Sequence, residues 1–142
     1  MTPSEELMKT VVEAWGEGDL GPLRAALHDD VVWISAASEW DERIRSGGVH
    51  RGRANVIALF AKMATAYTNA NARTKEIISS GEIVWGLFDV RGRYSGERDQ
   101  PDKNIASEIA LRWRIRGGKI IEAQTFFDTA GLLALQGQLR LS

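Results

Sequence analysis

The alternation of apolar and polar positions is clearest over residues 105–116. One side of this predicted strand carries apolar groups and one hydroxyl: Ile105, Ser107, Ile109, Leu111, Trp113 and Ile115. The other side carries charges: Glu108, Arg112, Arg114 and Arg116. A two-residue period of this kind is typical of a strand with one buried face. The Gly117-Gly118 pair allows the positive backbone angles of a tight hairpin, so residues 119–127 are predicted to return with Ala123, Thr125 and Phe127 on the apolar side.

Helical spacing dominates the first half of the chain. Thr2-Pro3-Ser4-Glu5 combines a capping residue, a proline at the first helical position and a glutamate three residues after the cap, which predicts a helix that ends at Gly16 or Gly18. A second, short helix is expected from Asp19 or Pro22, before Asp29-Asp30 turn the chain into a strand over 31–35. A third helix is indicated by apolar residues at helical spacing: Val56, Leu59, Phe60, Met63 and Tyr67.

The remaining segments complete an α+β pattern. Residues 36–52 form a predicted charged loop, residues 72–80 and 82–94 two further strands, and residues after Asp128 a last helix that ends at Gly137. Helices followed by a run of strands favour helices on one face of a curved antiparallel sheet. Because the chain has 142 residues and no linker or repeat, we expect a single domain over 1–142.

Composition narrows the classes of partner. The chain has no cysteine, which excludes disulfides and thiolate chemistry, and its net charge of -1 leaves no basic excess for nucleic acid or anionic lipid. No apolar run approaches the roughly 20 residues that span a bilayer. Because His28 and His50 do not stand at ligand spacing from carboxylates, no metal is expected. We therefore expect a cytoplasmic protein that binds neither nucleic acid nor membrane and needs no cofactor.

Several local signatures occur in a familiar order. They are Glu17-Gly18-Asp19-Leu20, the segment 27–33, Gly52-Arg53, Gly118-Lys119-Ile120 and Phe127-Asp128. In this order the chain resembles the nuclear transport factor 2-like superfamily and, within it, the SnoaL-like group. The resemblance implies a cystatin-like cone: a curved mixed, mostly antiparallel sheet, three helices wrapped around it, an apolar cavity inside and a homodimer formed through the outer sheet face. It does not imply one reaction, since this fold hosts isomerases, dehydratases, epoxide hydrolases, polyketide cyclases and binding modules.

Two chemistries of this superfamily can be compared residue by residue. The resemblance places the ketosteroid isomerase base on Ser35 and its two oxyanion donors on Val11 and Leu111, so none of the three required groups is present. The limonene epoxide hydrolase arginine and two aspartates fall on Leu87, Asp89 and Thr125, while its water-holding tyrosine and asparagine fall on Trp33 and Ser35. One carboxylate of that set remains, so neither residue set is complete.

Asp89 is the candidate catalytic residue. If Ile83, Trp85, Leu87 and Asp89 face the interior, the carboxyl group is partly desolvated, which raises a carboxyl pKa toward neutrality and suits acid-base chemistry. The same strand has an alternative apolar set on its other face, which consists of Val84, Phe88 and Val90. If that face is the buried one, a one-residue slip turns Asp89 outward, where it would pair with Arg91, Arg93 or a backbone amide.

The expected pocket combines aromatic and aliphatic walls with a few hydroxyls, as small-ligand sites do. Its predicted substrate-binding residues are Trp33, Ser35, Trp85, Leu87, Ser107, Ile109, Leu111, Thr125 and Phe127. The favoured function is binding of a small hydrophobic, cyclic molecule with acid-base catalysis on it. A non-catalytic binding module and an accessory domain acting through a dimer face remain as alternatives. That dimer face would include Glu108, Arg112, Arg114 and Gln124.

Overall fold

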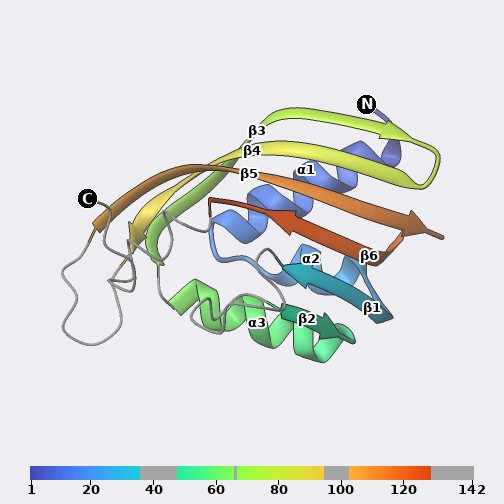
Figure 1. The fold of residues 1–142 in the computed structure, drawn as a ribbon, viewed down its shortest axis with the longest axis horizontal. Coiled ribbons are helices and arrows are strands. Elements are labelled where there is room, and N and C mark those ends of the chain that lie inside the picture. The colour runs from blue at the N-terminus through green and yellow to red at the C-terminus, as the bar shows by residue number, and fades with distance from the viewer. Residues whose placement is uncertain (36–47, 66, 95–102, 129–142) are drawn as a thin grey trace.

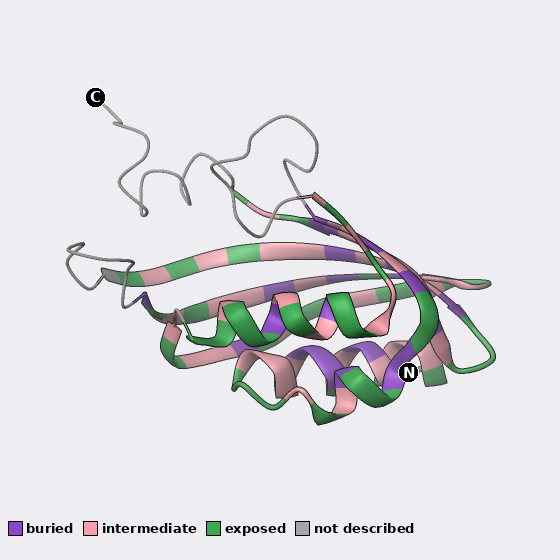
Figure 2. Ribbon diagram, turned by 90° about the horizontal axis from the view of Figure 1, so that it is seen from below, coloured by how far each residue is buried: buried purple, intermediate pink, exposed green. Residues whose placement is uncertain are grey.

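The computed structural model describes residues 1–35, 48–65, 67–94 and 103–128. Its elements follow the order α1 (Pro3–Gly16), α2 (Gly21–Ala26), β1 (Leu27–Ser35), β2 (Gly48–Arg51), α3 (Arg53–Thr65), β3 (Tyr67–Ser80), β4 (Ile83–Tyr94), β5 (Lys103–Arg116) and β6 (Lys119–Phe126). Figure 1 shows the strands as one arched sheet, and Figure 2 shows the helices together below its concave side. The predicted α+β class, with three helices and a mostly antiparallel sheet, is confirmed.

The six strands lie in the order β2-β1-β6-β5-β4-β3. All neighbours are antiparallel except β1 and β6, which run parallel with Trp33 opposite Ala123 and Ile34 opposite Gln124. This parallel pair brings the end of β1 beside the end of β6, although about ninety residues separate them in the chain. The predicted hairpin of residues 105–127 is confirmed, with Leu111 opposite Thr125 and Trp113 opposite Ala123.

The first helix begins as its sequence predicts and is fastened to β3. Thr2 caps it in a reciprocal capping box with Glu5, and Ser79 Oγ donates to the Glu5 carboxylate. Near the other end, the Thr74 backbone N–H and hydroxyl both donate to Glu13. Partial burial works to raise the pKa of the Glu13 carboxyl, but hydrogen bonds from Lys9 and Thr74 outweigh it and hold the pKa below its usual range. These contacts place α1 along the inner face of the sheet.

Several predicted boundaries differ from those in the structure. The expected turn at Asp29-Asp30 is wrong, since β1 already begins at Leu27 and passes through both residues with a register shift before Val32. Residues 48–51 of the expected loop form β2, which pairs with β1. Helix α3 ends at Thr65 and Tyr67 opens β3, because Tyr67 pairs with Tyr94 across the sheet, with ring centroids 5.4 Å apart. The rest of the predicted loop and the predicted C-terminal helix lie outside the described residues.

The favoured orientation of β4 is also wrong, and the alternative set faces the core. Val84 and Phe88 are fully buried, whereas Trp85 is 40% exposed. The pairing with β5 explains this, because Val84 lies opposite Trp113 and Phe88 opposite Ile109, and opposed residues share one face of a sheet. Gly86 also lies on the inner face, where a Cβ atom would stand 2.6 Å from Met8 Sδ of α1. The close approach of the helix therefore requires glycine in the inward-facing set.

Candidate functional site

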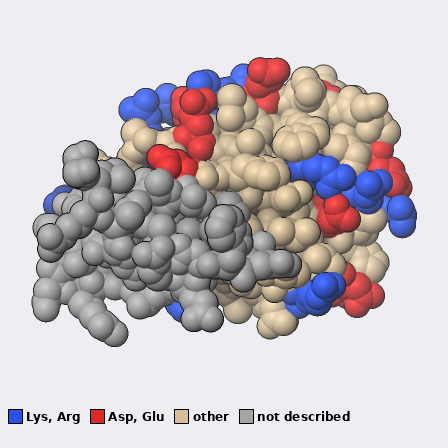
Figure 3. Space-filling view, viewed as in Figure 1, with Lys and Arg blue, Asp and Glu red and all other residues tan. Residues whose placement is uncertain are grey.

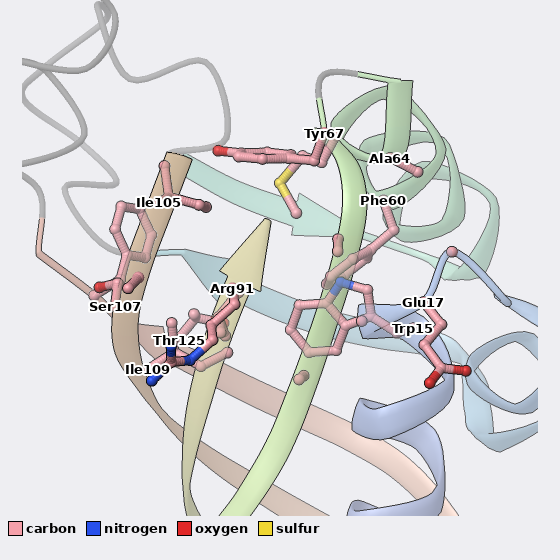
Figure 4. A pocket seen from close by; sticks show the side chains of 18 of the residues that line it. Trp15, Glu17, Phe60, Ala64, Tyr67, Arg91, Ile105, Ser107, Ile109 and Thr125 are labelled. Atoms are coloured by element: carbon pink, nitrogen blue, oxygen red, sulfur yellow. The ribbon is translucent and has the colours of Figure 1, made fainter. Parts of the chain in front are cut away.

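A cavity of about 530 Å³ lies between the inner sheet face and helices α1 and α3. Its walls are mainly apolar and aromatic. Figure 4 shows Ile105, Ser107, Ile109 and Thr125 along one side, with Trp15 and Phe60 facing them from the helices and Tyr67 across the opening. Sites of this size with apolar walls and few polar groups are typical of small-molecule binding.

Trp33 and Phe60 support one wall of this cavity. The Trp33 ring meets Phe60 edge to face with centroids 5.0 Å apart, and Phe60 in turn meets Trp15 at 4.6 Å. Behind this wall, Trp33 also contacts Trp113 at 6.1 Å. Edge-to-face aromatic pairs of this kind hold rings in fixed orientations, so the wall is a rigid surface built from α1, α3 and β1.

Two hydroxyls form the buried polar part of the cavity. Ser35 ends β1 and is 6% exposed, while Thr125 lies near the end of β6 and is 9% exposed. Trp33 Nε1 donates a hydrogen bond to Thr125 Oγ1 at 3.0 Å. Within the described ranges, Ser35 makes no side-chain hydrogen bond. The polar groups here are uncharged, and one of them is held in place by the indole.

Tyr67 contributes a third hydroxyl at the opening of the cavity. Burial, followed by the neighbouring Tyr94, raises the pKa of the Tyr67 phenol to about 12. The phenol is therefore protonated at neutral pH and can donate a hydrogen bond, but it does not supply a base.

The charged lining residues are exposed. Among the described residues around the cavity they are Glu17, Arg91 and Asp128, and Figure 4 shows Glu17 directed away from the hollow. No carboxylate or imidazole of the described chain is buried in this cavity. In the same part of the chain, no cluster of three histidines, aspartates or glutamates is placed to hold a metal ion.

The structure brings six of the predicted site residues together around the cavity: Trp33, Ser35, Ser107, Ile109, Thr125 and Phe127. Leu111 is fully buried on the same sheet face but does not reach the cavity wall. Trp85, Leu87 and Asp89 are on the outer face of β4, outside the cavity. The Ser107 hydroxyl makes a long local contact of 3.4 Å with the Glu108 carbonyl.

The orientation predicted for Asp89 is wrong. The carboxylate stands on the outer face opposite Glu108 of β5, and Lys75 of β3 forms an ion pair with Glu108 at 2.8 Å. Hydrogen bonding and attraction to Glu108, together with attraction to Asp89, raise the pKa of the Lys75 ammonium. Asp89 therefore belongs to a group of charges on the outer face, outside the cavity in which an acid-base role was expected.

The cavity also has lining residues outside the predicted site set, among them Trp15, Phe60, Tyr67 and Asn69. The sequence predicts Phe60 and Tyr67 only as residues of the third helix, and Trp15 lies in the predicted first helix without being singled out. Asn69 has a positive φ of 51° at an irregular position of β3, where the register with β4 shifts between Thr68 and Asn71. Asparagine tolerates this backbone region, but a single asparagine is a weak signal for such a bulge.

Comparison with known proteins identifies the architecture. The model of the SnoaL-like domain family matches residues 8–123. An NTF2-like protein of unknown function from Burkholderia pseudomallei is similar over 95% of this chain and 98% of its own, with 25% identity and a TM-score of 0.79. No curated protein matches the chain significantly.

Two further solved structures share the fold at lower identity. IdmH from Streptomyces antibioticus, described as a putative polyketide cyclase, has 22% identity and a TM-score of 0.76, with 96% of this chain and 99% of IdmH covered. TerC, co-crystallised with polyporic acid, has 20% identity and a TM-score of 0.78 over 96% of this chain and 99% of TerC. In the described part of the present chain, no helix is long and apolar enough to cross a membrane.

Proposed function

The chain belongs to the SnoaL-like domain family and has the NTF2-like, ketosteroid isomerase-like fold, and we propose that its cavity binds a small, hydrophobic, cyclic molecule. The observation that carries this proposal is the 530 Å³ hollow, which has apolar walls and a pair of buried hydroxyls at one place on its surface. Flat rings would pack against Trp15, Phe60 and Ile109, because these walls offer large apolar surfaces and no charge.

Binding is better supported than acid-base catalysis. A positioned acid or base must reach the reacting atom and must titrate near the working pH. The described lining residues that carry a charge are exposed, and the buried ones offer hydroxyls that neither gain nor lose a proton near neutrality. The similarity to IdmH, which is described as a putative polyketide cyclase, favours a polycyclic or polyketide-like ligand as the molecule that fits.

Filling the cavity should abolish binding without unfolding the domain. Ser107 faces the hollow from the middle of β5, so Ser107→Trp would place an indole in the space where the ligand is proposed to lie. We expect the bicyclic hydrocarbon tetralin to shift the indole N–H signals of Trp15 and Trp33 in 15N–1H NMR spectra of the parent protein. The same titration should leave the Ser107→Trp spectra unchanged.

Ser107→Ala is the matched control, since it removes the hydroxyl and leaves the space open. It should bind tetralin as the parent protein does. Shifts that persist in Ser107→Trp would show that the ligand lies elsewhere, and a parent protein that responds neither to tetralin nor to its ketone 1-tetralone would contradict the proposal.

We further propose that two copies of the chain associate through the outer sheet face. Trp85 and Phe126 are 40% and 41% exposed there and stack with centroids 6.0 Å apart. Arginines and glutamates pair around them, as in Arg112–Glu122 at 2.7 Å. Figure 3 shows Lys and Arg interspersed with Asp and Glu rather than a surface of one sign. A two-fold interface sets one patch against itself, so a patch with both signs around an apolar centre is self-complementary.

Sedimentation velocity at micromolar concentration should accordingly report a dimer. Trp85→Glu places a charge at the centre of the stacked pair and should give a monomer with unchanged circular dichroism, because Trp85 is outside the core. Val49→Glu is the control, since Val49 is 39% exposed and lies in β2, at the opposite edge of the sheet from β3 and β4. A parent protein that sediments only as a monomer would contradict this interface.

A further inference from the structure

The two buried hydroxyls of the cavity, Ser35 and Thr125, lie on the neighbouring strands β1 and β6. Trp33 lies opposite Ala123 and Ile34 opposite Gln124 in the parallel pair of β1 and β6. Continued by one residue, this register sets Ser35 beside Thr125, with the strands about 4.8 Å apart. Both side chains share the face of the buried Trp33 and Ala123, and both line the cavity.

The bond from Trp33 determines what Thr125 can offer to a ligand. An indole nitrogen can only donate, so Thr125 Oγ1 accepts this hydrogen bond at 3.0 Å. One lone pair of the hydroxyl is thereby used, and its own hydrogen has no acceptor among the residues that the structure describes. Thr125 thus presents an O–H donor to the cavity, and the hydroxyl of Ser35 is available beside it.

Both hydroxyls face an open hollow, where water can hydrogen-bond to them, and a ligand that displaces this water must replace its hydrogen bonds. The lining side chains Trp33, Ile109 and Phe127 cannot do so, since they offer no acceptor. A ligand atom that satisfies both donors must accept two hydrogen bonds from one side. A carbonyl oxygen does so through its two lone pairs, whereas a hydrocarbon satisfies neither donor.

From this geometry we propose that Ser35 and Thr125 form an oxygen-acceptor subsite, and that the ligand is a cyclic ketone, enone or quinone whose carbonyl oxygen lies between the two hydroxyls. This inference rests on the proposed function, because it names the chemical class that the same cavity selects. Trp33 acts as the positioning residue of the subsite, since its N–H directs the Thr125 hydroxyl hydrogen toward the ligand.

The matched probes 1-tetralone and tetralin differ only in the ketone oxygen. NMR titration should show that the parent protein binds 1-tetralone roughly three- to tenfold more tightly than tetralin, the range expected for a net neutral hydrogen bond. Ser35→Ala and Thr125→Val should each remove most of this preference, so that the affinities for 1-tetralone and tetralin become similar. The infrared carbonyl stretch of 13C-labelled 1-tetralone should move to lower wavenumber in the parent protein and less so in each variant.

Thr125→Ser is the control, because it keeps a hydroxyl that Trp33 can orient. It should retain the preference for the ketone, and Ser35→Ala preserves the Trp33–Thr125 bond in case Thr125→Val does not fold. Equal affinity for the two probes, or a preference that survives both Ser35→Ala and Thr125→Val, would overturn the subsite while the proposed function stands. Failure of both probes to bind the parent protein would overturn the proposed function itself, and the subsite with it.

Discussion

Replacing Trp33 by alanine is expected to destabilise the domain by about 3–5 kcal/mol, the usual cost of removing a large buried aromatic side chain. Trp33 is 1% exposed and joins three parts of the molecule, through ring contacts with Phe60 of α3 and Trp113 of β5 and a hydrogen bond to Thr125 of β6. Since domains are stable by only about 5–15 kcal/mol, the loss should be a large part of the whole. Urea denaturation followed by circular dichroism measures it.

Trp85→Ala provides the matched comparison on the opposite face of the sheet. Trp85 is 40% exposed and has one stacked partner, Phe126, so the expected cost is about 1 kcal/mol. The free energy of unfolding should be measured in dilute solution, where association of two copies of the chain does not add to it. If Trp85→Ala cost as much as Trp33→Ala, the face of β4 that we assign to the interior would be wrong, and Asp89 would again be a candidate for the cavity.

The second large effect concerns the contact between α1 and β3. Within a helix, glycine to alanine normally stabilises by about 0.5–1 kcal/mol. At Gly16 the added Cβ would stand 2.5 Å from both the backbone nitrogen and the Cβ of Ala72. Because a strand backbone cannot rotate away as a flexible side chain can, we expect Gly16→Ala to destabilise by about 1–3 kcal/mol. Thermal and urea unfolding would both show whether Gly16→Ala lowers the free energy of unfolding instead of raising it.

Two control substitutions test whether the loss of stability comes from the contact with the backbone of β3. Thr10→Ala lies on an exposed position of the same helix and should be stabilising by a few tenths of a kcal/mol. Gly86→Ala would meet Met8 Sδ and the Phe88 ring, both at 2.6 Å, and no backbone atom as closely, so its cost should be smaller than that of Gly16→Ala because side chains can shift where a strand backbone cannot. A stabilising Gly16→Ala would mean that α1 and β3 do not approach as closely as the structure describes.

The buried face was predicted correctly for β5 and wrongly for β4, and both results have one physical cause. Over residues 105–116 of β5 every inward position is apolar or a small hydroxyl and most outward positions are charged, so only one face can be buried. In β4 both faces carry apolar groups, and the more hydrophobic set, Ile83, Trp85 and Leu87, faces outward. The inward set includes Gly86, which contributes no apolar surface of its own but admits Met8 of α1. The sequence pattern of the strand therefore favoured the wrong face.

The residues of the candidate site also fall into two groups, those that the sequence predicts and those that only the tertiary structure brings to the cavity. Ser35, Ser107, Ile109, Thr125 and Phe127 could be predicted because each follows the period of a strand whose buried face is unambiguous. Trp15 and Phe60 reach the cavity only because α1 and α3 pack beside each other below the sheet, and Tyr67 reaches it because β3 starts earlier than propensity suggests. The proposed subsite of Ser35 and Thr125 depends on the parallel contact of β1 and β6.

The sequence by itself determined the fold class, the capped first helix, the C-terminal hairpin with its two faces, and the family. These features depend on local periodicity, caps and turn residues, which act over a few positions and are visible in the chain. Only the tertiary structure decided the face of β4, the outward place of Asp89, the aromatic wall and the placement of the two buried hydroxyls on neighbouring strands. Each of these features depends on which distant segments of the chain pack against each other. The free energy of that packing depends on both segments, so the sequence of one segment does not predict it.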